Sequence, residues 1–226
     1  MTEAPNTPLY PSVDATALPW LAVEQMAEAD RLAVEEFGIE LLQMMEHAGA
    51  ALADLVMHLA PKGRLTVLAG GGNNGGGGLS AARHLINRGR EVELVLATER
   101  PGAAVCHHLV TLRRMGIEPT ERPGGDVAID ALVGYGLSGP LRGPAAVLAA
   151  WASAHRAVCL DLPSGHGFKG AVEPLATLTL ALPKEVLANV RPLYVADIGI
   201  PGALWREMGI ESGEPFRGGR IVEIVR

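Results

Sequence analysis

The stretch of the sequence best suited to binding a ligand is residues 70–78, which contain seven glycines and two asparagines. We call it the glycine segment. The apolar residues 64–69 before it predict a buried strand, and residues 79–86 after it predict a helix. Glycines at such a junction leave backbone N–H groups uncovered at a helix N-terminus, where anions and above all phosphates bind. We therefore expect a ligand-binding loop, with a tight turn of small residues as the alternative.

Two aspartates and a serine are the next candidates for chemistry, because they also lie in or after apolar runs. Asp130 lies within residues 127–133, and Asp161 and Ser164 follow the strand expected at residues 156–160. An isolated charge in such a place is costly, so each aspartate either caps the turn after it or has a function. In the functional interpretation, one carboxylate binds a hard cation and the other transfers protons. The sequence does not assign these two roles.

The amides of Asn73 and Asn74 add further oxygen donors, which bind cations or hydrogen-bond to ligand hydroxyls. Amide, carboxylate and hydroxyl oxygens together suit Na⁺, K⁺, Ca²⁺ or Mg²⁺ rather than a soft metal. The spacing of Gly70, Gly72 and Gly75 also satisfies the G-x-G-x-x-G fingerprint of dinucleotide-binding folds, with Glu93 placed to bind a ribose. This match is weak, since seven glycines satisfy many patterns. A nicotinamide-dependent oxidoreductase is therefore a minor alternative.

Most other polar or sulfur-containing side chains are expected to have structural roles. Lys184 is the exception, because it follows an expected strand and is either a phosphate partner in the crevice or a solvated surface residue. We expect core packing for Met44, Met45, Cys106 and Cys159, and surface or packing roles for His107 and His108. A turn cap is expected at Asp197.

Strands alternate with helices along the sequence, which predicts an α/β fold with a mostly parallel sheet. Residues 1–19, with four prolines, predict an extended or disordered arm ahead of one domain at residues 20–226. The expected helices are residues 20–33, 39–59, 79–86, 103–115 and 144–153. The expected strands are residues 64–69, 91–97, 127–133, 156–160, 177–182, 193–196 and 221–225. Ligands bind beyond the carboxyl ends of parallel strands, so the glycine segment, Asp130 and the turn at Asp161 should meet at one crevice.

The composition excludes several classes of protein. The 226 residues carry a net charge of −6 and no run of Lys or Arg, so a nucleic-acid binder is not expected. The two cysteines lack CxxC spacing and predict neither a disulfide framework nor a zinc site. No secretory signal pattern is visible, and the longest uncharged apolar stretch, residues 145–154, is too short to span a bilayer. We therefore expect a cytoplasmic protein without a membrane partner.

Several short segments occur in a fixed order along the chain. They are residues 67–78, 82–85, 130–134, 137–143, 161–165 and 196–201, preceded by residues 25–30 and 45–49 in the two opening helices. Together these segments resemble the YjeF N-terminal domain family, whose enzymatic members are NAD(P)H-hydrate epimerases. The resemblance extends over residues 20–202, and the ordered combination is specific although each segment alone is not.

The resemblance implies a Rossmann-like three-layer sandwich, with a mostly parallel central sheet and helices on both faces. It implies an isomerase that interconverts the R and S forms of hydrated NADH and NADPH (NADHX and NADPHX). A separate ADP- or ATP-dependent dehydratase would act on the product, and a homodimer is expected. The resemblance also implies a bound potassium ion, with ligands at Asn74, Asp130 and Ser164. The implied substrate contacts are Asn73, Asn74, Gly75, Gly76, Gly77, Gly134, Tyr135, Gly136, Leu137, Ser138, Gly139, Pro140 and Asp161, and the best acid–base candidate is Asp161.

The sequence departs from the family pattern at a position that matters for catalysis. The family loop usually reads Gly-Asn-Asn-Gly-Gly-Asp-Gly, and here the position of its aspartate is occupied by Gly77. Glycine can present its N–H to a phosphate but cannot transfer a proton. Residues 45–47 and 166–169 also differ from the usual pattern. An alternative hypothesis is therefore a degenerate member that binds a nucleotide or a protein partner without turnover.

Overall fold

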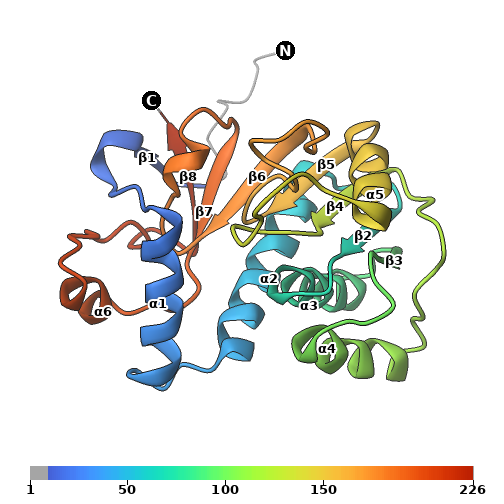
Figure 1. Cartoon of the computed structure of the whole chain (residues 1–226), viewed down its shortest axis with the longest axis horizontal. Coiled ribbons are helices and arrows are strands. Elements are labelled where there is room, and N and C mark those ends of the chain that lie inside the picture. Colours follow the sequence, from blue (N-terminus) through green and yellow to red (C-terminus); the bar gives the residue numbers. More distant parts are fainter. Residues whose placement is uncertain (1–9, 226) are drawn as a thin grey trace, which may run out of the picture.

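The computed structural model describes residues 10–225, which form one eight-stranded sheet covered by helices (Figure 1). The order of the strands across the sheet is β1-β8-β7-β6-β5-β4-β2-β3. The strands from β2 to β7 are mutually parallel, whereas β8 is antiparallel to β7 and parallel to β1. The strands are β1 (Ser12–Asp14), β2 (Leu65–Ala69), β3 (Val92–Leu96), β4 (Val127–Ala131), β5 (Arg156–Leu160), β6 (Pro174–Leu180), β7 (Leu193–Ala196) and β8 (Ile221–Val225).

Helices cover both faces of the sheet, as Figure 1 shows. They are α1 (Val23–Glu35), α2 (Leu41–Leu59), α3 (Asn73–Asn87), α4 (Ala103–Arg114), α5 (Gly143–Ser153) and α6 (Gly202–Glu207), with 3₁₀ turns at Ala15–Ala17 and Glu185–Leu187. Alternate residues of β2 divide between the faces, since Val67 packs with α2, α3 and α4 while Leu68 packs with α5. The α/β three-layer architecture expected from the sequence is confirmed. No helix within residues 10–225 is long and apolar enough to cross a membrane.

The topology places three loops at one point of the sheet. The chain leaves β2 for β3 on one side and then returns to place β4 on the other side of β2. The carboxyl ends of β2 and β4 therefore diverge at a topological switch point, where ligands bind in open α/β sheets. Because β5 is the neighbour of β4, the turn that begins at Asp161 joins the same region.

Several expected boundaries differ from the structure. The helix expected at residues 79–86 begins earlier, at Asn73, so most of the glycine segment is helical. The strand expected at residues 127–133 ends at Ala131, and helix α6 was not predicted. Within the expected N-terminal arm, Ser12–Asp14 pairs with β8 as an edge strand, whereas residues 1–9 lie outside the described part of the chain.

Candidate functional site

The glycine segment has two structural roles. Some of its glycines allow backbone segments to pack closely, and others leave the N-terminus of α3 uncovered. A Cβ atom on Gly70 would lie 1.7 Å from the backbone oxygen of Leu132, and one on Gly75 would lie 2.0 Å from the oxygen of Gly70. Glycine is therefore required where β2, the loop after β4 and the first turn of α3 touch. Gly72, the N-cap of α3, has open space around it. Within the described chain, the first bond of α3 is donated by the N–H of Gly76 to Gly72, so the N–H groups at residues 73–75 have no helical acceptor.

A pocket of about 440 Å³ opens beside this helix N-terminus, within the range of small-molecule sites. Its walls come from α1, α2, the glycine segment and the loops after β4, β5 and β6. Of the expected substrate contacts, those that line it are Asn73, Asn74, Gly77, Gly134, Tyr135, Gly136 and Asp161. Leu137 lines a second pocket of about 390 Å³ that shares Tyr135 with the first. The others, Gly75, Gly76, Ser138, Gly139 and Pro140, line neither of these pockets.

Asp161 is held in the pocket wall by a buried ion pair. Its Oδ1 accepts a hydrogen bond of 2.7 Å from Nζ of Lys184, and its Oδ2 accepts one of 3.0 Å from the backbone N–H of Tyr135. The backbone of Asp161 has a left-handed φ of 67°, which few non-glycine residues adopt. This conformation follows directly after β5 and places the carboxylate at the end of the sheet.

Lys184 is not the solvated surface residue of one expectation, but it does line the crevice, as the other expectation required. Its role as a phosphate partner stays a prediction. Its side chain is only 1% exposed. Besides the bond to Asp161, its ammonium donates to Oγ1 of Thr179 at 3.0 Å and to the backbone oxygen of Leu180 at 2.9 Å. An ammonium has three donors, and all three are used within the protein. Lys184 therefore neutralises and orients Asp161.

A second carboxylate, for which the sequence predicts no role, also lines the pocket. Asp30 of α1 accepts a hydrogen bond of 2.5 Å at Oδ2 from the hydroxyl of Tyr135. Burial raises the pKa of Asp30, and this effect outweighs the hydrogen bond from Tyr135, which lowers it. Burial, followed by the hydrogen bond to Asp30, raises the pKa of Tyr135 well above its ordinary value. Tyr135 thus contacts both carboxylates of the pocket, one through its hydroxyl and one through its backbone.

Asp130 and Ser164, two of the expected cation ligands, bind each other directly. Asp130 is fully buried, and its Oδ2 and Oδ1 accept hydrogen bonds from the N–H and Oγ of Ser164 at 2.8 Å and 2.6 Å. Burial raises the pKa of Asp130. No Lys, Arg or His pairs with this carboxylate among the described residues. Such a carboxylate fits a cation, although it also caps its own turn through the N–H of Leu132.

Asn74 belongs to the pocket wall and makes no hydrogen bond to Asp130 or Ser164 within the described chain. Its Nδ2 donates to the backbone oxygen of Leu160 at 3.3 Å. Its Oδ1 lies 3.4 Å from the position that a Cβ atom on Gly134 would occupy. The structure therefore joins two of the three expected ion ligands directly and places the third at the neighbouring loop. Residues 10–225 contain no cluster of three His, Cys, Asp or Glu side chains suited to a metal.

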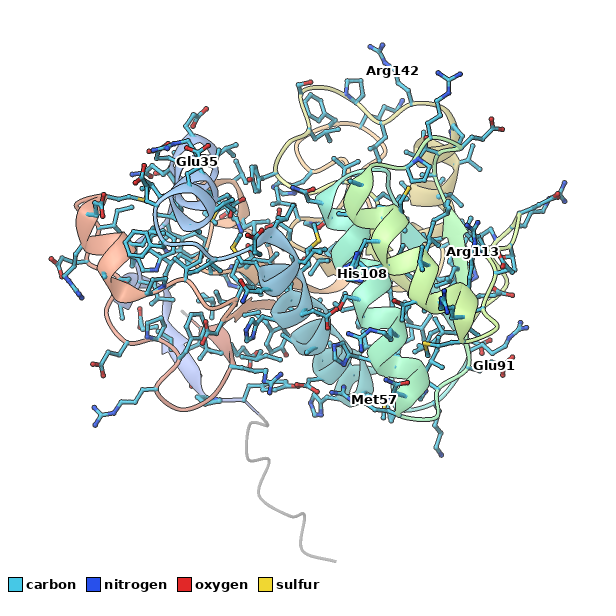
Figure 2. All side chains as sticks on the ribbon, turned by 90° about the horizontal axis from the view of Figure 1, so that it is seen from below. Glu35, Met57, Glu91, His108, Arg113 and Arg142 are labelled. Atoms are coloured by element: carbon cyan, nitrogen blue, oxygen red, sulfur yellow. The ribbon has the colours of Figure 1, made fainter. Side chains whose placement is uncertain are left out.

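Most of the expected structural residues are confirmed in that role. Asp197 accepts a hydrogen bond from the N–H of Gly199 at 2.8 Å as a turn cap. Met44 and Met45 are buried, as expected, but they also line the pocket. His108, labelled in Figure 2, is buried on α4, whereas His107 is exposed. Cys159 is buried, as expected, and burial raises the pKa of its thiol. Cys106 is exposed, so the expectation that it packs in the core was wrong.

Glu93 does not reach the pocket, which removes the ribose-binding acid of the oxidoreductase alternative. It pairs in register with Thr66 near the start of β2, whereas the glycine segment follows the end of that strand. Its carboxylate accepts hydrogen bonds from Oγ1 of Thr66 at 3.1 Å and from the N–H of Gly124 at 2.8 Å. That interpretation of the glycine fingerprint was therefore wrong.

Comparison with known proteins gives consistent matches over most of the chain. Residues 41–186 match the family described as YjeF-related protein N-terminus. The NAD(P)H-hydrate epimerase of Dehalogenimonas lykanthroporepellens is 36% identical, over 95% of this chain and 96% of that protein. The NAD(P)H-hydrate epimerase of Rhodopirellula baltica is also 36% identical, over 85% of this chain and 89% of that protein.

Two further matches concern a longer protein and a solved structure. A bifunctional NAD(P)H-hydrate repair enzyme of Salinibacter ruber is 34% identical, over 84% of this chain but only 43% of its own length. The crystal structure of the yeast protein ynu0 superposes with a TM-score of 0.79 at 23% identity, over 92% of this chain and 100% of that chain. At that identity, the yeast structure supports the fold alone.

Proposed function

The chain belongs to the family of YjeF-related protein N-termini, and we propose that it is an epimerase that interconverts the R and S forms of NADHX and NADPHX. The observation that carries this proposal is the similarity along almost the full length of two proteins named NAD(P)H-hydrate epimerase. The pocket supports it, because backbone N–H groups of α3 suit the anionic phosphates of a dinucleotide. Its size and its largely apolar walls suit the nicotinamide end.

The proposed epimerisation requires proton transfer at the hydrated nicotinamide ring. The dihydronicotinamide ring is an enamine, so addition of water places the hydroxyl on a carbon next to the ring nitrogen. Inversion at this carbon proceeds when a protonated acid gives its proton to the hydroxyl, the C–O bond breaks, and water leaves. The nitrogen lone pair stabilises the resulting cation. Water then adds to the opposite face and loses a proton to a base. We propose that Asp161, held by Lys184, is this base.

The test of the proposed function is recovery of NADH from R-NADHX in the presence of an S-specific dehydratase. We expect the protein to accelerate recovery well beyond spontaneous epimerisation, with the dehydratase in excess and the protein limiting. An inert protein would contradict the proposal. An inert protein that becomes active through Gly77→Asp would support the degenerate alternative. A Cβ atom at Gly77 would approach only the end of a flexible side chain, Cδ2 of Leu160 at 2.9 Å, so this variant is expected to fold.

We further propose that a potassium ion binds beside Asp130 and Ser164, with Asn74 as a third ligand. Supporting this is the fully buried carboxylate of Asp130, for which no cationic side-chain partner is found in the described chain. When bound, the ion would supply a positive charge next to the loop that carries Tyr135. In this proposal, Ser164 connects the turn after β5 to the loop after β4. Its N–H donates to Asp130, and its hydroxyl oxygen accepts the N–H of Val133.

If potassium binds at this site, the free energy of unfolding should depend on which cation the buffer contains. At a potassium concentration ten times the dissociation constant, we expect the free energy of unfolding to rise by about 1.4 kcal/mol relative to equal choline chloride. Sodium, being smaller, should give less. The measurement is denaturant unfolding in each salt at equal ionic strength, and the difference should vanish in Asp130→Asn. Equal stability in all three salts would contradict the proposed ion site.

The remaining expectations also belong to this proposal. The bifunctional relatives are named as repair enzymes, and we propose that a dehydratase acts on the product of this chain. The homodimer and the cytoplasmic location stay predictions.

A further inference from the structure

The pocket contains one carboxylate, that of Asp30, to which the proposed function assigns no role. Among the described residues that line it, three carry a charged group, namely Asp30, Asp161 and Lys184. Asp161 and Lys184 satisfy each other in the buried ion pair. Asp30 has no cationic side chain bonded to it, and no hydrogen bond to its Oδ1 is found within the described chain. This oxygen is therefore available to a ligand in the pocket.

The position of Asp30 relative to Asp161 is fixed by Tyr135. The hydroxyl of Tyr135 binds Asp30 at 2.5 Å, and the backbone N–H of the same residue binds Asp161 at 3.0 Å. The two carboxylates are thus bridged by one tyrosine and approach the pocket from different elements. Asp30 comes from α1, which packs outside the sheet, and Asp161 comes from the end of β5. A ligand in the pocket can therefore contact one carboxylate from each of these two elements.

We propose that Asp30 is a second catalytic residue of the epimerase, which exchanges a proton with the substrate hydroxyl on the face opposite to Asp161. This inference rests on the proposed function. In one direction, protonated Asp30 gives its proton to the hydroxyl, the C–O bond breaks with its electron pair on oxygen, and water leaves. Water then adds on the other face, its oxygen forms the new C–O bond, and its extra proton passes to Asp161. The reverse reaction, or proton exchange with solvent, restores both carboxyl groups.

The environments of the two carboxylates differ. The ammonium of Lys184 donates a hydrogen bond of 2.7 Å to Oδ1 of Asp161, whereas Asp30 has no cationic side chain bonded to it among the described residues. Burial favours the protonated form of Asp30, since it raises the pKa of that carboxyl. The groups that act on Asp30 are Tyr135 and Lys184, which lower its pKa, and Asp161, which raises it. A carboxyl group whose pKa is raised by burial is typical of a general acid. Tyr135 is a positioning residue in this scheme.

The experiment compares Asp30→Asn with the wild type in the coupled NADHX assay. We expect kcat to fall about 100-fold or more, as for loss of an acid–base group, while KM changes by less than about threefold. Incorporation of ¹⁸O from labelled water into the substrate hydroxyl should fall with it. The matched control is Asp54→Asn, a carboxylate on α2 that pairs with Arg88 outside the pocket, and its activity should be unchanged. Retention of near-wild-type kcat by folded Asp30→Asn would overturn the inference.

A second variant keeps the inference testable if Asp30→Asn does not fold. Tyr135→Phe removes the hydrogen bond that lowers the pKa of Asp30, so that pKa should rise. Activity in the direction that needs protonated Asp30 should then persist to higher pH than in the wild type. An unchanged pH profile of kcat in Tyr135→Phe would overturn the inference. A wild type without epimerase activity would instead overturn the proposed function, and the inference with it, before any variant is made.

Discussion

Replacing Lys184 with methionine is expected to lower the free energy of unfolding by about 3–5 kcal/mol, the cost of leaving a buried charge without its partner. The side chains of Lys184 and Asp161 are 1% and 5% exposed, so water cannot replace the lost ammonium. Methionine keeps most of the volume of the lysine stem, which limits the contribution of a cavity. The measurement is equilibrium denaturation by urea, with activity followed in parallel.

Two further variants separate the ion pair from general damage to the fold. In the double variant Lys184→Met with Asp161→Asn, the unpaired charge is gone, and we expect part of the lost stability to return. The control is Arg113→Met on α4 (Figure 2), which breaks the pair between Arg113 and Glu118. The side chains of this pair are 54% and 69% exposed. That change should cost less than about 1 kcal/mol. A loss of similar size in both single variants would contradict a special role for the buried pair.

The sequence predicted which strand ends meet, but not which side chains pair there. The apolar runs and the alternation of strands and helices indicated that the glycine segment, Asp130 and Asp161 share one edge of the sheet, because parallel strands end together. Lys184 was predicted to be either solvated or a phosphate partner, since the expected strand before it offers no carboxylate to pair with it. Its partner Asp161 lies 23 residues away and is brought near only by the pairing of β5 with β6.

The same reason explains why Asp30 received no role. Its partner Tyr135 is 105 residues away, and α1 reaches the pocket only through its packing beside the sheet. The periodicity of α1 predicts which residues are apolar, but a single aspartate on the polar side of a helix is ordinary at the sequence level. Local signals therefore locate the loops of the pocket, whereas long-range contacts decide the chemistry of its carboxylates.

The glycine segment shows a different limit of prediction. Glycine has low helix propensity, so the sequence predicts a loop at residues 70–78, yet α3 begins at Asn73. Tertiary packing overrides the propensity, since residues 75–78 are buried where α3 approaches α2 and the ends of β2 and β4. The glycines of this stretch are therefore needed for two reasons, close backbone packing and an uncovered helix N-terminus. Substitutions at Gly75 and Gly72 can separate these two reasons.

Gly75→Ala is expected to destabilise the protein by about 1–3 kcal/mol or more and to disrupt the N-terminus of α3. Alanine in a helix is favoured over glycine by about 1 kcal/mol, so propensity alone predicts the opposite sign. The clash decides the outcome, because the new Cβ atom would lie 2.0 Å from the backbone oxygen of Gly70 and 2.9 Å from its nitrogen. Backbone atoms cannot rotate away as the end of a side chain can. The measurement is urea denaturation of the variant against the wild type.

The matched control is Gly72→Ala, three residues earlier, where nothing lies within 4 Å of the added Cβ atom. Its φ of −99° suits alanine, so only the weaker N-cap preference for glycine is lost, a cost below about 1 kcal/mol. If both variants lose little stability, the loop at Gly70 can shift and close packing does not explain the glycines there. If only Gly75→Ala unfolds readily, the segment is fixed in place by backbone contact. The N–H groups of residues 73–75 are then preorganised for an anion, because their positions do not depend on a ligand.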